Sequence, residues 1–299
     1  MGHTGRVTRT TSLGNRTSTV LGRRLGGELL RLRDGAGLTQ RQAAEAINAT
    51  NSKIVKMEQG WVPMRDPDIR VLCEFYGVED PEVLARLLAL AKLDRERRKA
   101  KGWWLNANYN KGRGFLDFVA LEDGASRIRN WQISLIPGLL QTAAYTRAMA
   151  VVNPSWDDLD EIEMDVEVKQ KRQRRLVGEN PVQLHAVMWE GALRQQFGGR
   201  DVMRGQMERL LEVSEFPNVR LQVLPFRHGA HPGVSGPFVI LSYAETGALD
   251  VVESDTHRDM MWMENEECAY FNELFDRISR HSLSPHDSIA LIESLHKES

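Results

Sequence analysis

The stretch GLTQRQAAEAINATNSKIVKMEQG, residues 37–60, determines the fold of the first part of the chain. Thr39 and Gln42 stand in the relation of a capping box, in which two residues satisfy each other's backbone donors at the start of a helix. The helix that they open runs to Ile47 and carries alanines at regular places. Small residues at such places favour close packing of a second helix, so we expect a helical hairpin.

A tight turn and a second helix follow directly. Asn48 falls where a left-handed residue is needed, and Asn tolerates a positive φ better than most residues. Thr50 is a suitable N-cap for the next helix, and Gly60 closes that helix. Ile54 and Met57 then point back toward the first helix, which predicts two short helices joined by a tight turn.

Polar side chains gather at the start of this second helix. The residues expected on its exposed face are Thr50, Asn51, Ser52, Lys53 and Lys56. Lysine donates to guanine, asparagine pairs with adenine through two hydrogen bonds, and hydroxyls reach bases or phosphates. Gln40 and Arg41 open the first helix and are placed to contact phosphate. We therefore interpret the pair as a helix-turn-helix that binds double-stranded DNA, the alternative being a capped hairpin in a structural bundle.

Three further helices surround the hairpin. Four leucines at helical spacing predict one that ends near Gly35. Asp-Pro dipeptides at 66–67 and 80–81 start the other two, because proline fits the first helical turn. We expect the last helix to end within DRERRKAKG, residues 94–102. We expect NANYNKGRG, residues 106–114, to form a linker. The five helices make an all-α domain.

The chain is thus expected to be multidomain. We assign a flexible basic arm to residues 1–19, the DNA-binding domain to residues 20–105 and an α+β domain to residues 106–299. In the last domain VQLHAVMW, VRLQVLPF and PFVILSY are typical of strands in a small antiparallel or mixed sheet. The helices predicted there are Asp157–Val177, Asp201–Val213, Glu264–Arg280 and Pro285–Lys297.

Charge and cysteine content limit the classes of function that fit the chain. Residues 1–111 hold 20 Lys and Arg against 12 Asp and Glu, so they carry +8 while the whole chain carries −2. This asymmetry indicates a polyanionic partner for the first part. Cys73 and Cys268 offer neither a disulfide framework nor a zinc site. Since no apolar run is long enough to span a membrane and no signal-peptide core is present, we expect a cytoplasmic protein.

At this point the motifs resemble a known family. Residues 37–60, together with LCEFYGV and PEVLARLLALAK, are similar to the Xre/Cro-type, lambda-repressor-like helix-turn-helix. GWW, IPGLLQTAAYTRA and LQVLPFRHGAHPGVSGPFVIL resemble the long C-terminal domain of actinobacterial Xre-type regulators often described as antitoxin-like. Asn48, Ala43 and Lys53 depart from the usual pattern, in which a glycine, a larger apolar residue and a short hydroxyl residue are common.

The resemblance implies a sequence-specific regulator of transcription. Such proteins bind the two half-sites of a palindromic operator as a homodimer, with recognition helices about 34 Å apart. A small protein encoded by a neighbouring gene is often their partner, and a ligand is the other form of control that we consider. The alternative is an antitoxin-like interaction protein that sequesters its partner and binds DNA for autoregulation.

Enzymatic alternatives have weaker support. His228 and His231, with a carboxylate such as Glu253 or Asp255, suggest a metal site, but two histidines in a Gly/Pro loop more often make ordinary loop contacts. His185 and Glu190 suggest an acid–base pair, but their separation across a strand-to-helix junction fixes no geometry, and two independent hydrogen-bonded side chains are the better interpretation. The tryptophans more often pack in a core than line a pocket. We therefore expect no catalytic site, no cofactor and no metal.

Overall fold

The computed structural model describes two compact units, Met1–Lys99 and Ala100–Ser299. The described residues are 20–99, 113–152, 159–244, 250–255, 260–263 and 266–298. Three features of the sequence lie outside the described residues: the arm predicted at residues 1–19, the domain boundary predicted between residues 105 and 106, and the tryptophans Trp103, Trp104 and Trp156. Within the described part of the chain, no helix has the length and apolar character needed to cross a membrane.

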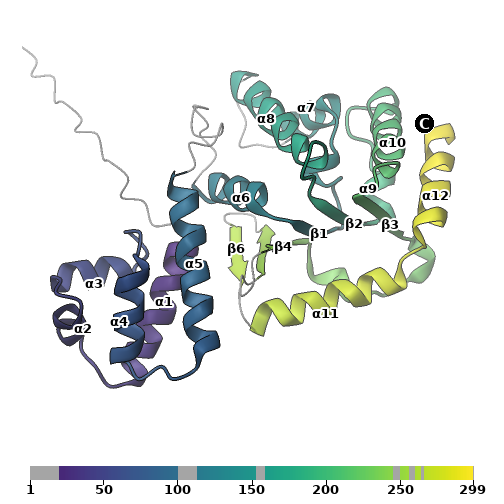
Figure 1. The fold of residues 1–299 in the computed structure, drawn as a ribbon. Helices are drawn as coiled ribbons and strands as arrows, with labels where there is room; N and C mark the ends of the chain where they lie inside the picture. Colours follow the sequence, from purple (N-terminus) through teal and green to yellow (C-terminus); the bar gives the residue numbers. More distant parts are fainter. Residues whose placement is uncertain are drawn as a thin grey trace, which may run out of the picture. The chain divides into compact units, whose positions relative to one another are not determined.

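The described part of the first unit, residues 20–99, is all α-helical, as predicted. Its helices are α1 (Val20–Gly35), α2 (Gln40–Ala46), α3 (Asn51–Glu58), α4 (Asp66–Phe75) and α5 (Pro81–Lys99), shown in Figure 1. Side chains from four of these helices are almost fully buried in the unit: Leu21, Leu25 and Leu29 of α1, Leu87 and Leu90 of α5, Ile54 of α3 and Ile69 of α4. The apolar positions that were read from the sequence therefore form one core.

Helix α5 continues to Lys99, within the segment 94–102 where we expected it to end. Two arginines of its last turns donate to backbone carbonyls between α3 and α4: Arg95 to Met64 at 2.7 Å and Arg98 to Gly60 at 2.7 Å. These tertiary hydrogen bonds hold the highly charged last turns of α5 against the segment between α3 and α4.

The second unit contains a six-stranded mixed sheet. Its strands are β1 (Arg127–Gln132), β2 (Gln183–Trp189), β3 (Val219–Leu224), β4 (Phe238–Ser242), β5 (Val251–Asp255) and β6 (Met260–Met263). They lie in the order β3-β2-β1-β4-β5-β6. The β1–β2 and β2–β3 pairs are parallel, and the other three pairs are antiparallel. The α+β assignment and the mixed sheet are confirmed, with more strands than we expected.

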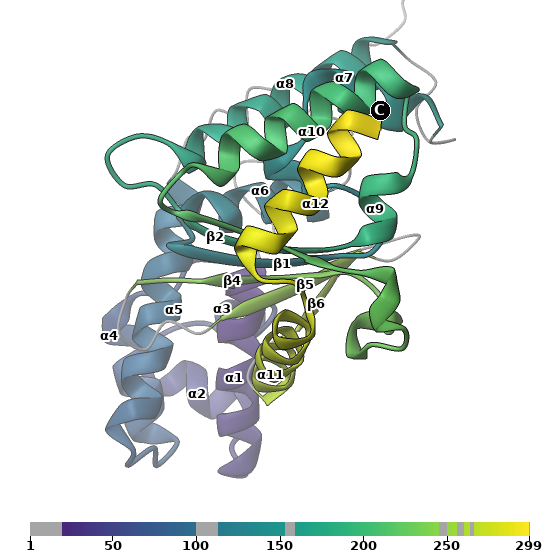
Figure 2. The ribbon, with the colours of Figure 1, turned by 90° about the vertical axis from the view of Figure 1, so that its right-hand side faces the viewer.

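Helices cover both faces of this sheet (Figure 2). The helices of the unit are α6 (Arg113–Gly124), α7 (Ala143–Val151), α8 (Leu159–Arg172), α9 (Glu190–Arg194), α10 (Arg200–Ser214), α11 (Glu266–His281) and α12 (Pro285–Glu298). On one face α11 places Phe275 and Ile278 against Trp131, Val187 and Leu224. On the other face α12 and α10 pack on β3 and on each other. The four predicted helices correspond to α8, α10, α11 and α12.

Three strands were missed, and β1 is the most informative of them. Its sequence RIRNWQ looks too polar for a strand, yet it lies in the middle of the sheet with Arg129 and Asn130 buried. The Arg129 guanidinium donates to Asp250 at 2.9 Å, so a distant carboxylate stabilises the polar strand. Trp131 belongs to the same strand and is completely buried, as expected for a core tryptophan.

Candidate nucleic-acid interface

The predicted hairpin of α2 and α3 forms with its predicted caps. At the start of α2, the Thr39 hydroxyl accepts from the Gln42 amide, and the Gln42 side chain accepts from the Thr39 amide at 2.9 Å. Asn48 has a φ of 49° and is the one non-glycine residue with positive φ among the described residues. The Thr50 hydroxyl accepts from the Lys53 amide at 3.2 Å. Local side-chain chemistry therefore defines the turn and the start of α3.

Two glycines allow α1 and α3 to approach closely. A Cβ atom on Gly26 would lie 2.4 Å from the carbonyl oxygens of Met57 and Glu58. A Cβ atom on Gly60, whose φ is +68°, would lie 2.2 Å from the backbone nitrogen of Arg23. Gly26 lowers helix propensity, but it is needed because backbone fills the space that a side chain would take.

A buried ion pair holds the other end of α3. The Nε atom of Arg33 on α1 donates to Glu58 at 2.6 Å, and both side chains are less than one tenth exposed. This hydrogen bond raises the pKa of Arg33, against the effect of burial. A second guanidinium nitrogen donates to the Leu38 carbonyl at 2.6 Å, and the Gln40 amide donates to Glu58 at 2.7 Å. Together these bonds fix α1, α2 and α3 relative to one another.

The predicted DNA-contacting residues fall into two groups. Two lie at the start of α2, and the others lie within α3 or directly before it. Asn51, Ser52 and Lys56 are exposed, and no hydrogen bond or ion pair among the described residues uses their side chains. The Arg41 side chain is 85% exposed and pairs with Glu45 at 3.0 Å. Because a surface ion pair contributes little free energy, Arg41 can leave Glu45 for another anion, such as a phosphate.

Three predicted residues have structural partners as well. Gln40 is part of the cluster around Glu58, and one of its two amide protons is used there. Thr50 caps α3 with its hydroxyl. Lys53 pairs with Asp68 on α4 at 2.8 Å, with 40% of the lysine side chain still exposed. The sequence therefore predicted these residues as DNA contacts but did not reveal their structural partners.

The partners Glu58 and Asp68 were missed in the sequence. Neither stands at a helical spacing from the residue that it contacts: Arg33 lies 25 positions from Glu58, and Lys53 lies 15 positions from Asp68. No local pattern could have identified them. Asp68 directs the Lys53 ammonium group, and Glu58 directs Gln40, so both orient side chains of the candidate interface.

The alternative histidine sites do not assemble a catalytic or metal-binding group among the described residues. The ring of His231 packs against Trp131, with centroids 5.5 Å apart, and burial lowers its pKa. The ring of His228 lies 4.6 Å from that of His281. In this part of the chain no cluster of three His, Cys, Asp or Glu side chains could hold a metal ion.

The proposed acid–base pair also separates into independent contacts. His185 bonds to Gln222 at 2.7 Å, and burial lowers its pKa to about 4. Glu190 accepts from Arg194 at 2.6 Å and from the Phe226 amide at 2.8 Å. Each side chain therefore has its own hydrogen bonds, as two unrelated residues would.

The geometry of α2 and α3 defines a helix-turn-helix protein, which is a class of DNA-binding regulators. A family profile described as "Helix-turn-helix domain" matches residues 24–87 and agrees with this assignment. A second profile, "Domain of unknown function (DUF5753)", matches residues 115–294, which is more than half of the chain, and the chain belongs to that family. Neither a curated protein nor a solved structure matches the chain.

Proposed function

We propose that this protein is a sequence-specific transcriptional regulator that reads the major groove with α3, from about Thr50 to Gln59. The observation that carries the proposal is the state of the first turn of α3. Asn51 and Ser52 are exposed and without partners among the described residues, while the helix beneath them is fixed by buried contacts. A rigid helix with free polar side chains at its N-terminal end is suited to hydrogen bonding with base edges.

Arg41 and Gln40 then serve as phosphate contacts at the start of α2. Such contacts fix the register of the protein on DNA and contribute affinity without sequence preference. Lys53, whose ammonium group is directed by Asp68, contacts a base beside Asn51. In this proposal the protein acts by binding and not by catalysis, and it works in the cytoplasm.

A homodimer is the expected form on DNA. One helix-turn-helix reads only a few base pairs, whereas two of them related by a twofold axis read an inverted repeat. The test is selection of duplexes from a pool of genomic fragments by the full chain. We expect an inverted repeat whose half-sites are centred about 10 base pairs apart. Retention of fragments without a shared motif would contradict sequence-specific reading.

Control by a small protein or a ligand is assigned to the C-terminal unit, in line with the Xre-type, antitoxin-like resemblance. Apolar exposure supports a protein partner and thus also the antitoxin-like alternative: Val151, Val152 and Leu159 are 73%, 69% and 77% exposed. Co-expression with the product of a neighbouring small gene tests this. If the protein is a regulator, we expect the two proteins to form a complex of fixed stoichiometry that no longer binds the operator. If loss of the complex frees the partner's activity but leaves transcription unchanged, the antitoxin-like alternative is favoured.

A further inference from the structure

A pocket lies beside the carboxyl ends of two parallel strands in the C-terminal unit. Trp189 ends β2 and Leu224 ends β3, and the next residue of each, Glu190 and Pro225, lines the pocket. Its volume is about 540 Å³, within the range of about 300–1,000 Å³ typical of small-molecule sites. Open sheets with parallel strands commonly bind ligands just outside the carboxyl ends of those strands.

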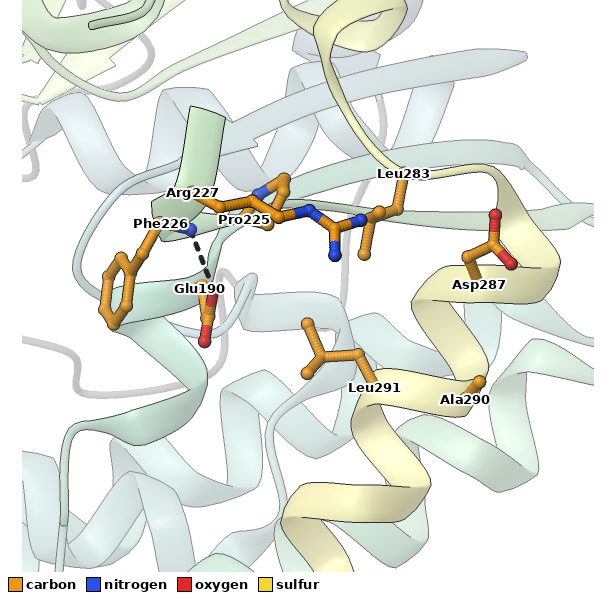
Figure 3. Close-up of a pocket in the computed structure, with 8 residues that line it drawn as sticks. All are labelled: Glu190, Pro225, Phe226, Arg227, Leu283, Asp287, Ala290 and Leu291. Atoms are coloured by element: carbon orange, nitrogen blue, oxygen red, sulfur yellow. Dashed lines mark hydrogen bonds between the residues drawn. The ribbon is translucent and has the colours of Figure 1, made fainter. Parts of the chain in front are cut away.

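The walls of this pocket are mainly apolar. Its apolar lining residues are Pro225, Phe226, Leu283, Ala290 and Leu291, which come from the segment after β3 and from α12 and the turn before it (Figure 3). Phe226 belongs to η4 (Phe226–His228), and its ring packs edge-on against Trp189 with centroids 5.0 Å apart. These walls suit a hydrocarbon or aromatic body.

Three charged residues complete the lining, and two of them are already engaged. Glu190 is buried and accepts from Arg194 and from the Phe226 amide, so both of its oxygens have donors. Ser284 caps α12, and Asp287 in the first turn accepts from the Ser284 hydroxyl at 2.8 Å. Both carboxylates therefore already use part of their hydrogen-bonding capacity within the protein.

Arg227 is in a different state. Its guanidinium extends across the pocket toward Leu283, on the opposite side from Leu291 (Figure 3). The side chain is exposed, and the hydrogen bonds and ion pairs among the described residues do not include it. It contributes to a lowered pKa of Asp287, for which the hydrogen bond from Ser284 is the larger cause. The pocket thus offers one uncommitted cation above apolar walls.

We propose that this pocket binds a small organic carboxylate with an apolar body, whose carboxylate pairs with Arg227 and whose body lies against Phe226 and Leu291. A planar guanidinium binds a carboxylate through two parallel hydrogen bonds, which explains the choice of anion. The proposal concerns binding in the C-terminal unit alone. Its failure would leave the DNA-binding function untouched, and failure of DNA binding would leave this site untouched.

Equilibrium dialysis of the full chain against 2-naphthoate and 2-naphthamide tests the proposal. The two probes share the apolar body and differ in charge. We expect saturable binding of one naphthoate per chain, and binding of naphthamide about tenfold weaker or more, because a hydrogen-bonded ion pair is lost. Arg227→Gln should remove this difference, while Arg204→Gln on α10 should preserve it. Equal binding of both probes to the parent protein, or unchanged naphthoate binding by Arg227→Gln, would overturn the proposal.

A second pair of variants locates the site. Ala290 is an exposed residue of α12 that lines the pocket, so Ala290→Trp should fill it and abolish naphthoate binding. Ala269 is an exposed alanine of α11 outside the lining, so Ala269→Trp should bind naphthoate like the parent. Circular dichroism should show both variants folded. Naphthoate binding that survives Ala290→Trp unchanged would place the probe elsewhere and contradict the assignment.

Discussion

The first turn of α3 and the central strand β1 both carry polar side chains, but with opposite consequences. Asn51 and Ser52 on α3 are exposed and have no partner among the described residues. Arg129 on β1 is buried and pairs with Asp250 at 2.9 Å. A polar side chain that the fold leaves free is available to an outside partner, whereas one that the fold pairs contributes to stability. Polar side chains therefore indicate an outside partner in one region and a structural role in the other.

The largest effect is expected at the buried ion pair between α1 and the C-terminal end of α3. Glu58→Gln removes the buried counter-charge of Arg33 and leaves its guanidinium only the ion pair with the exposed Asp34. Removing one partner of a buried pair costs about 3–5 kcal/mol, and because the Asp34 pair remains we expect a loss of about 3 kcal/mol in the free energy of unfolding. Urea denaturation followed by circular dichroism measures it.

The exposed pair of Arg41 and Glu45 is the matched control for this prediction. Glu45→Gln should change stability by about 0.5 kcal/mol or less, because solvent screens the pair. Equal effects of the two substitutions would mean that the cluster around Glu58 does not hold α1, α2 and α3 together.

The second prediction concerns a buried titratable group beside β1. His185 lies opposite Arg129 in the strand pairing, and its pKa is lowered to about 4, chiefly by burial. Because an unfolded histidine has a pKa of about 6.5, the unfolded state binds the proton first as the pH falls. Stability is therefore intact above about pH 6.5 and declines toward pH 4, by about 3 kcal/mol in total.

Urea titrations of the parent and of His185→Gln at several pH values test this. Glutamine can still hydrogen-bond to Gln222 but cannot titrate. The variant should lack the part of the pH dependence that lies between pH 4 and 6.5. Identical slopes in that range would show that His185 is accessible to protons in the folded state.

The third prediction compares two neighbouring glycines of α1. Gly26→Ala places a methyl group against two backbone carbonyls of α3 and should destabilise the first unit by about 1–3 kcal/mol. Nothing lies within 4 Å of a Cβ atom on Gly27, so Gly27→Ala should stabilise the helix by about 0.5–1 kcal/mol. Thermal unfolding of both variants measures the difference. Two variants of equal stability would contradict the close approach of α1 and α3.

These cases also show what could be predicted from the sequence. Thr39, Asn48 and Thr50 act on residues within three positions of themselves, and the hairpin that they define was predicted correctly. Gly26 lowers the helix propensity of α1, and the contact that requires a glycine there lies 31 positions further along the chain, at Met57. Strand β1 was missed for a similar reason, since the partner of Arg129 is 121 positions away. Local chemistry could be predicted, and contacts between distant segments could not.

The central claim is that the first turn of α3 reads bases, and the affinity of Asn51→Ala for two duplexes tests it most directly. With the selected operator, Asn51→Ala and Lys53→Ala should each lose about 1–3 kcal/mol of binding free energy, while Asn51→Ala should bind unrelated DNA almost as the parent does. Arg41→Ala, the phosphate-contact control, should weaken both complexes equally and reduce the salt slope by about 0.9. Folded Asn51→Ala and Lys53→Ala proteins that discriminate operator from unrelated DNA as well as the parent would contradict the claim.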